Sequence, residues 1–163
     1  MKVDQVMSRK IILIARDTPF SDLWEIIFKK RINAAPVVDK SKKLFGIITR
    51  DDMLRFLYPD YSEFIAEFST LKDFEGMEEK IHDLLPLTAA DMMCKKVIYT
   101  RTDTPIMRAL SRMIVRNVNQ LPVLDDNDKV VGIITKGDIF YALFRRHLAR
   151  PKANKPKSSR RKT

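Results

Sequence analysis

Apolar residues in the first 57 positions recur with the spacings of short strands and amphipathic helices. The apolar run Ile11–Ile14 predicts a buried strand. Thr18 and Pro19 then suit the N-cap and the first position of a helix. The apolar residues that follow lie at i, i+3, i+4, i+7 and i+8 and predict one helical face: Phe20, Leu23, Trp24, Ile27 and Phe28. We interpret Trp24 as a core residue, with ligand stacking as the alternative.

Two more strands and a second helix follow. Ala35–Val38 and Leu44–Ile48 are short apolar runs separated by the polar turn Asp39–Lys43, a pattern that predicts paired strands. Asp51 and Asp52 would lie in the first turn of a helix, where negative charge is stabilised by the helix dipole. The predicted order is strand, helix, strand, strand, helix.

The second half of the chain repeats this arrangement at a constant shift of 86 residues. GIITRDD (Gly46–Asp52) returns as GIITKGD (Gly132–Asp138), and the segments Asp17–Pro19 and Pro36–Asp39 return as well. Such an internal repeat predicts two copies of one structural unit. The second copy should contain the strands Val97–Thr100, Leu121–Leu124 and Val130–Ile134, a helix starting at Thr104–Pro105 with the apolar face Ile106, Ala109, Leu110, Met113 and Ile114, and a final helix Lys136–His147.

The segment between the copies is acidic, and the C-terminal tail is basic. Residues 59–91 carry a net charge of −7, whereas residues 145–163 contribute +9 of the total of +10. Apolar residues at helical spacing predict one or two amphipathic helices between the copies, interrupted near Gly76. The tail lacks apolar periodicity and is predicted to be disordered. We therefore divide the chain into a first repeat (1–58), a helical linker (59–88), a second repeat (89–147) and a disordered basic tail (148–163).

Several classes of protein are disfavoured by the composition. Cys94 is the single cysteine, so no intramolecular disulfide can form, and His82 and His147 lie outside any ligand-like spacing. No apolar run reaches the roughly 18 residues of a membrane span, and the N-terminus lacks the apolar core of a signal peptide. We therefore expect a soluble, cytoplasmic protein without a metal site.

The repeated Thr-x-x-Asp pair is the strongest candidate for chemistry. Thr49 and Asp52, like Thr135 and Asp138, lie three residues apart where a strand turns into a helix. A carboxylate there can accept hydrogen bonds from both hydroxyls of a ribose, and the free amides of the helix start can meet a phosphate. The alternative is that each pair only caps its helix. The sequence contains no Gly-rich phosphate loop and no plausible nucleophile–base pair, so we expect no enzymatic activity.

The repeated unit resembles a CBS domain, because an apolar-Pro-Val-apolar-Asp strand precedes Gly-apolar-apolar-Thr-x-x-Asp. Two units in tandem resemble a Bateman module, over about Lys2–Leu57 and Ala89–Phe144. The resemblance implies an α+β fold in which two β-α-β-β-α repeats pack around a pseudo-twofold axis. It also implies adenosine-containing ligands in clefts between the repeats, and a disc-shaped homodimer.

The resemblance further implies two sites, each built from both repeats. One would combine Thr49 and Asp52 with Val118, Asn119, Met93, Lys96 and Ile98. The other would combine Thr135 and Asp138 with Ile32, Asn33, Met7, Lys10 and Ile12. The candidate phosphate partners are the basic residues Lys10, Lys96, Arg50 and Lys136.

We interpret the chain as a regulatory sensor of an adenine nucleotide such as AMP, ADP or ATP, which passes a signal to a partner protein. S-adenosylmethionine, NAD and cyclic dinucleotides are alternative ligands. A different interpretation is a dimeric adaptor whose basic tail binds nucleic acid or another polyanion. Such binding would be electrostatic, since the tail has no aromatic residues for base stacking. The tail could also only solubilise the protein or fold back on the acidic linker.

Overall fold

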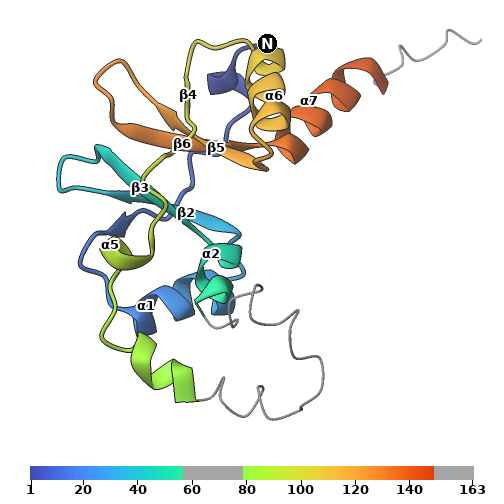
Figure 1. The fold of residues 1–163 in the computed structure, drawn as a ribbon. Helices are drawn as coiled ribbons and strands as arrows, with labels where there is room; N and C mark the ends of the chain where they lie inside the picture. The colour runs from blue at the N-terminus through green and yellow to red at the C-terminus, as the bar shows by residue number, and fades with distance from the viewer. Residues whose placement is uncertain (57–78, 149–163) are drawn as a thin grey trace, which may run out of the picture.

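The computed structural model describes residues 1–56 and 79–148, which form two three-stranded sheets (Figure 1). In the first repeat, β1 (Ile14–Ala15) pairs in parallel with β2 (Ala34–Val38), which pairs antiparallel with β3 (Leu44–Thr49). In the second, β4 (Thr100–Arg101), β5 (Gln120–Leu124) and β6 (Val130–Thr135) follow the same order. Val37 faces Gly46 and Val123 faces Gly132, so the register also repeats. The predicted α+β fold with two equivalent repeats is confirmed.

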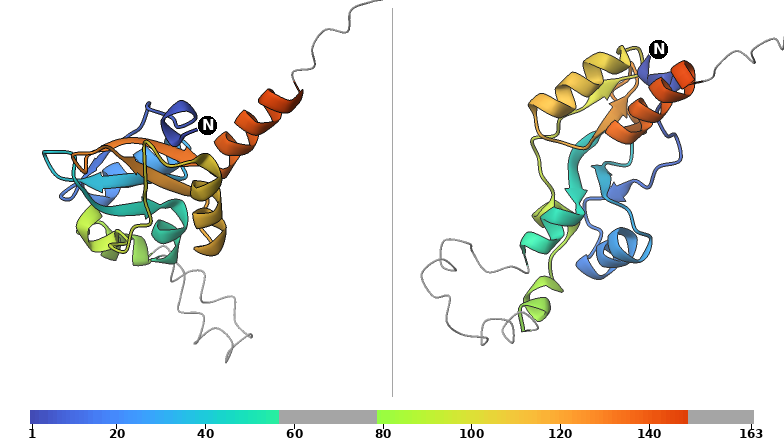
Figure 2. Two further views of the ribbon diagram at one scale, coloured as in Figure 1. Left: turned by 90° about the horizontal axis from the view of Figure 1, so that it is seen from above. Right: turned by 90° about the vertical axis from the view of Figure 1, so that its right-hand side faces the viewer.

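Helices lie beside the sheets in both repeats (Figure 2). In the first repeat, α1 (Phe20–Trp24) continues into a π-helical turn, η2 (Glu25–Lys29), and α2 (Arg50–Arg55) follows β3. In the second repeat, α6 (Ile106–Val115) and α7 (Lys136–Leu148) take these places. A short 3-10 helix η1 (Val3–Gln5) precedes β1, and a helix at residues 79–84 and α5 (Ala89–Met92) precede β4. The rest of the predicted linker helices and the basic tail from residue 149 lie outside the described residues.

The first strand of each repeat is shorter than predicted and begins later. Only Ile14 of the run Ile11–Ile14 is in a strand, and only Thr100 of Val97–Thr100. The reason is that Ile11 and Leu13 pack against a small cluster shared by both sheets, centred on Val38, Leu124 and Val130. This part of the chain therefore crosses between the repeats, where it is not paired with β2.

The helix starts are displaced by one residue from the prediction. Pro19 and Pro105, rather than Thr18 and Thr104, are the N-cap residues of α1 and α6. Pro19 has extended backbone angles and forms a bridge with Thr88, while the Thr18 carbonyl accepts the N–H of Ala89 at 2.9 Å. Pairing with another chain segment therefore extends the chain up to the proline.

The prediction that Trp24 is a core residue is wrong. Its side chain is 42% exposed and stacks on Phe28 with ring centroids 4.0 Å apart, whereas the equivalent Leu110 is 6% exposed. At about 100° per residue, the predicted five-residue face spans too wide an arc to be buried completely. Phe20, Leu23 and Ile27 are buried, as are their equivalents in the second repeat, whereas one member of each face is exposed: Trp24 in the first and Ile114 (61%) in the second.

Each repeat is completed by the segment that precedes the first strand of the other repeat. We call these leading segments residues 1–8 and 84–94. Val3 and Met7 belong to the core cluster of the second repeat, whereas Leu84, Met92 and Met93 belong to that of the first. Backbone pairing accompanies this exchange: Ser8 and Ile133 exchange two hydrogen bonds of 2.9 and 3.0 Å, and Ile47 and Cys94 exchange two of 3.1 and 2.9 Å. The two repeats therefore share their cores.

Two glycines permit the close approach of the leading segments. A Cβ atom on Gly46 would lie 2.5 Å from Sδ of Met93, and one on Gly132 would lie 2.7 Å from Sδ of Met7 and 2.8 Å from the carbonyl oxygen of Ser8. The repeated glycine is therefore required by the exchange.

We expect Gly132→Ala to destabilise the protein by about 1–3 kcal/mol, because the new methyl group overpacks against backbone. Gly137→Ala is the control, since its Cβ would meet only Thr135 Oγ1, at 3.5 Å, and alanine favours the helix. Urea unfolding of both variants would measure the difference. Equal stabilities would contradict the account of the close approach.

Candidate functional site

Thr49 and Asp52 form a reciprocal cap at the start of α2. The N–H and the hydroxyl of Thr49 both donate to Oδ2 of Asp52, at 2.9 and 2.7 Å, and the Asp52 N–H donates to the Thr49 hydroxyl at 3.0 Å. Both residues are half-buried. No hydrogen bond from the described residues reaches the second carboxylate oxygen, Oδ1. Half of this carboxylate therefore caps the helix, and half remains able to accept hydrogen bonds.

The second copy has the same geometry at the start of α7. Oδ2 of Asp138 accepts hydrogen bonds from the N–H and the hydroxyl of Thr135, both at 2.8 Å, and the Asp138 N–H donates to that hydroxyl at 3.0 Å. These residues are also half-buried. The predicted helix cap is therefore present in both repeats, and it leaves the ligand hypothesis open.

A third Thr-x-x-Asp pair, at the start of α5, shows that the cap alone does not define a site. Oδ2 of Asp91 accepts hydrogen bonds from the N–H and hydroxyl of Thr88 at 2.8 and 2.9 Å. These bonds, that from the backbone N–H first, lower the pKa of the exposed Asp91 carboxyl. This pair does not follow a Gly-containing strand, so the surroundings rather than the cap distinguish the repeated motifs.

The leading segments run past the two repeated motifs. Met93 packs on Gly46 and Cys94 pairs with Ile47, in the strand that ends at Thr49. Met7 packs on Gly132 and Ser8 pairs with Ile133, in the strand that ends at Thr135. Met93 and Met7 thus lie on the strands that lead to the first and second motif, respectively, and their contact with a ligand stays a prediction. Just after the leading segments, Lys10 and Lys96 are exposed, whereas Ile12 and Ile98 are half-buried.

Asn33 and Asn119 lie beside the motif of their own repeat. The carbonyl of Asn33 accepts the N–H of Arg50 at 3.0 Å, and the carbonyl of Asn119 accepts the N–H of Lys136 at 3.1 Å. Ile32 and Val118, which precede them, are half-buried. No hydrogen bond between described residues joins Asn119 to Thr49 or Asp52, or Asn33 to Thr135 or Asp138. Their combination across the repeats stays a prediction.

Two of the candidate phosphate partners already have protein contacts. The Arg50 guanidinium lies over the ring of Phe28, 5.7 Å from its centroid, and its Nε is buried without a hydrogen bond to any described residue. The Lys136 ammonium donates to Oδ1 of Asn119 at 3.3 Å. A phosphate would therefore compete with these contacts, or extend them.

Sequence reasoning missed a cavity beside Asp138. Its volume is about 550 Å³, and it lies between the first leading segment and α7. The residues that line it with Asp138 are Met1, Gln5, Val6, Tyr141, Ala142, Arg145 and Arg146. The spacing of Asp138, Tyr141 and Arg145 at i, i+3 and i+7 on one helix was the available signal.

The CBS domain family model matches residues 3–59 and 89–145. An uncharacterised protein of Methanocaldococcus jannaschii is 30% identical over 154 residues, which cover 88% of this chain and 91% of that protein. The inosine-5′-monophosphate dehydrogenase of the same organism is 29% identical, over 85% of this chain but only 23% of the enzyme. The likeness to that enzyme is therefore confined to a minor part of its length.

Solved CBS-pair structures have the same fold. The CBS domain pair of protein MJ0100, in complex with 5′-methylthioadenosine and S-adenosyl-L-methionine, matches with a TM-score of 0.65 and 26% identity, over 90% of this chain and 98% of that one. The CBSX2 protein of Arabidopsis thaliana, in complex with AMP, matches with a TM-score of 0.70 and 21% identity over the same shares. The second likeness shows the fold alone. Nothing in these comparisons supports nucleic-acid binding.

Within residues 1–56 and 79–148, no helix is both long and apolar enough to cross a membrane. Nor do three or more His, Cys, Asp or Glu side chains gather there in a way that could hold a metal ion.

Proposed function

Because this chain belongs to the CBS-domain family and carries the domain twice, we propose that it is a regulatory module that binds adenosine-containing ligands at its two Thr-x-x-Asp motifs. One observation carries the proposal. Both motifs leave the same carboxylate oxygen without a hydrogen bond from the described residues, and both lie on a strand packed against the leading segment of the other repeat.

The chemistry of the motif suits a ribose. Oδ1 of Asp52 or Asp138 can accept hydrogen bonds from two adjacent hydroxyl groups while Oδ2 keeps the helix cap. The cap holds the side chain in place before the ligand arrives, which lowers the entropic cost of binding. Hydrogen bonds to a charged acceptor are among the stronger ones in proteins.

We propose that each ligand is also contacted by residues of the other repeat. Asn33 and Ile32 would face the adenine of the ligand held by Asp138, and Asn119 and Val118 that of the ligand held by Asp52. At the Asp138 site, Arg145 and Arg146 line the adjoining cavity and could also neutralise a phosphate. AMP, ADP and ATP are the first ligands to test, followed by S-adenosylmethionine, 5′-methylthioadenosine, NAD and cyclic dinucleotides.

A ligand in such a site would act on both repeats together. The leading segment at each motif continues into the other repeat, so a ligand that favours one arrangement of the repeats changes the surface offered to a partner protein. This role is regulatory and not catalytic. The cytoplasmic location expected from the sequence stays a prediction.

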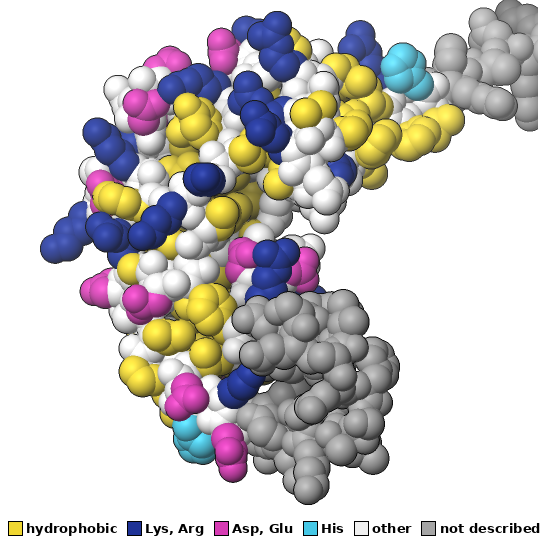
Figure 3. Space-filling view, in the orientation of Figure 1, with side chains coloured by type: hydrophobic (Ala, Val, Ile, Leu, Met, Phe, Trp, Pro, Cys, Tyr) yellow, Lys and Arg dark blue, Asp and Glu magenta, His cyan; other side chains and the backbone are white. Residues whose placement is uncertain are grey.

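We also propose that a second copy of this chain covers α6 and α7. Large apolar side chains are exposed along both helices, among them Val115 (76%), Phe144 (58%) and Leu148 (70%). Apolar side chains gather over α7 at the upper right of Figure 3. An exposed apolar face of this kind is typical of a protein–protein interface.

Asp52→Asn and Asp138→Asn should each remove one ligand site. The loss of a hydrogen bond to a charged group costs about 1.5–3 kcal/mol, so each variant should bind roughly ten- to a hundredfold more weakly at its own site. Calorimetry with AMP, ATP and S-adenosylmethionine would count the sites. Each single variant should lose one binding event, and the double variant should lose both.

Asp51→Asn is the matched control, because it removes an exposed carboxylate from the same helical turn without affecting the Thr49 cap. It should bind like the wild type. A double variant that binds these ligands as tightly as the wild type would show that the motif is only a helix cap.

Phe144→Asp should convert the proposed dimer into a monomer, since a buried charge at an apolar interface is costly. Light scattering at high micromolar concentration would give the mass, and Lys95→Glu, an exposed substitution outside α6 and α7, is the control. A wild-type protein that is monomeric with and without ligand would refute the dimer.

A further inference from the structure

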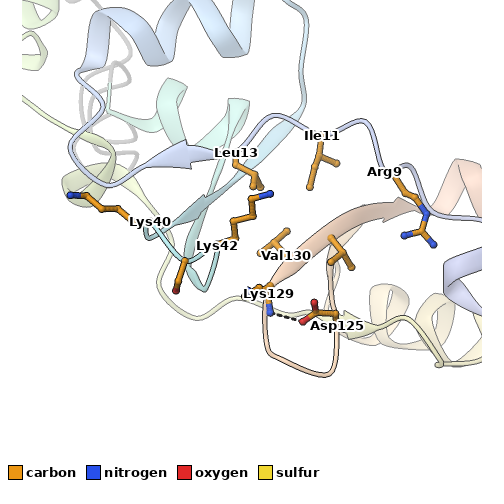
Figure 4. Close-up of a pocket in the computed structure, with 10 residues that line it drawn as sticks. Arg9, Ile11, Leu13, Lys40, Lys42, Asp125, Lys129 and Val130 are labelled. Carbon is orange, nitrogen blue, oxygen red and sulfur yellow. Dashed lines mark hydrogen bonds between the residues drawn. The ribbon is translucent and has the colours of Figure 1, made fainter.

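The turns of the two β-hairpins meet at the junction of the repeats and border a cavity. The N–H of Val130 donates to the carbonyl of Lys42 at 3.0 Å, and Lys43 forms a bridge with Lys129. Together with part of residues 9–13, these turns border a cavity of about 600 Å³ that is open to solvent (Figure 4). Small-molecule sites commonly have volumes of about 300–1,000 Å³.

This cavity is distinct from the Thr-x-x-Asp motifs. It lies at the beginning of β6 and beside the β2–β3 turn, whereas Thr49 and Thr135 end their strands. From residues 9–13, only Arg9, Ile11 and Leu13 line it. Alternate residues of an extended segment point to opposite sides, so Lys10 and Ile12 are directed elsewhere.

The cavity combines an apolar wall with several cations. Ile11, Leu13 and Val130 supply apolar surface. Arg9, Lys40, Lys42 and Lys129, from three parts of the chain, also line it, and all four residues are exposed. Figure 4 shows Lys42 pointing toward Leu13, whereas Lys40 points away from the cavity.

The cations lack close acidic partners among the described residues. The ion pairs found there join Lys29 to Glu25 and Arg101 to Asp128. Asp125 is the one acidic residue of the cavity lining, and its Oδ1 accepts the N–H groups of Asn127 and Lys129, both at 2.9 Å. Exposed positive charges along one surface repel one another weakly, and a bound anion offsets that repulsion.

The repeat symmetry does not require these charges. A shift of 86 residues places Asp126 at the position of Lys40 and Asp128 at that of Lys42. The fold therefore accepts either sign of charge in this turn. A rival explanation is that the basic turn 39–43 is simply attracted to the acidic turn 125–129 beside it.

We propose that this cavity is a third ligand site, which takes a small phosphorylated organic molecule. Its apolar part would lie on Ile11 and Val130, and its phosphate would meet Lys42, which points toward Leu13; Arg9 lies at the other end of the cavity lining (Figure 4). This inference does not depend on the two adenosine sites. A ligand here would contact both hairpin turns and so fasten the two repeats together.

The test uses the full chain carrying Asp52→Asn and Asp138→Asn, with AMP, inorganic pyrophosphate and adenosine as probes. AMP and pyrophosphate should raise the melting temperature, and adenosine should not. Adding Lys42→Gln should weaken phosphate binding about tenfold or more. Adding Lys43→Gln, in the same turn but outside the cavity lining, should leave it unchanged.

The two explanations predict opposite effects without ligand. If the site is built for an anion, adding Lys42→Gln to the Asp52→Asn, Asp138→Asn variant should leave its melting temperature unchanged or raise it, because one repelling charge is removed. If the basic and acidic turns attract each other, the same substitution should lower the melting temperature. A lower melting temperature would overturn the proposal. So would equal losses in the Lys42 and Lys43 variants, or a failure of both phosphate probes to stabilise the parent. The basic tail is the same in every variant, so the differences report the cavity.

Discussion

The close contact between each leading segment and the glycine strand of the other repeat is the constraint on which this structure depends. Met7 fits on Gly132 and Met93 on Gly46 only because no side chain occupies either glycine. The same segments supply core residues and backbone hydrogen bonds to the opposite repeat. Neither repeat has a complete core by itself, so the two should fold as one cooperative unit.

The exchange also gives the Thr-x-x-Asp motif its surroundings. Thr88 and Asp91 make the same hydrogen bonds to Oδ2 in a place with no repeated glycine strand, so a cap is not evidence of a ligand. At Asp52 and Asp138, one carboxylate oxygen caps the helix, and the other, which accepts no hydrogen bond from the described residues, is the one that we propose binds a ligand. In this proposal the helix cap uses Oδ2 and the ligand uses Oδ1 of the same side chain. An Asp→Asn substitution can therefore weaken ligand binding while it leaves much of the cap in place.

The sequence predicted the parts of the fold that local pattern determines. The repeat at constant shift located β2, β3, β5, β6 and α7 to within a residue or two, because strand alternation and turn residues act locally. The prediction was wrong where segments distant in sequence meet. Ile11 and Leu13 pack against a cluster shared by the repeats, and Pro19 forms a bridge with Thr88. Trp24 shows that the apolar pattern of a helix does not reveal which of its apolar residues are buried by the rest of the fold. Arg145 was missed because its helical spacing from Asp138 has meaning only beside the first leading segment.

The central claim is that each motif and the other repeat bind one ligand together. Photoaffinity labelling of the full chain with an azidoadenosine nucleotide, followed by peptide mapping, tests it most directly. We expect label within residues 7–12 or 32–33 that disappears in Asp138→Asn and persists in Asp52→Asn. Label that depends on Asp138 but lies only in the second repeat would contradict the claim. Label that is insensitive to both substitutions would contradict it as well.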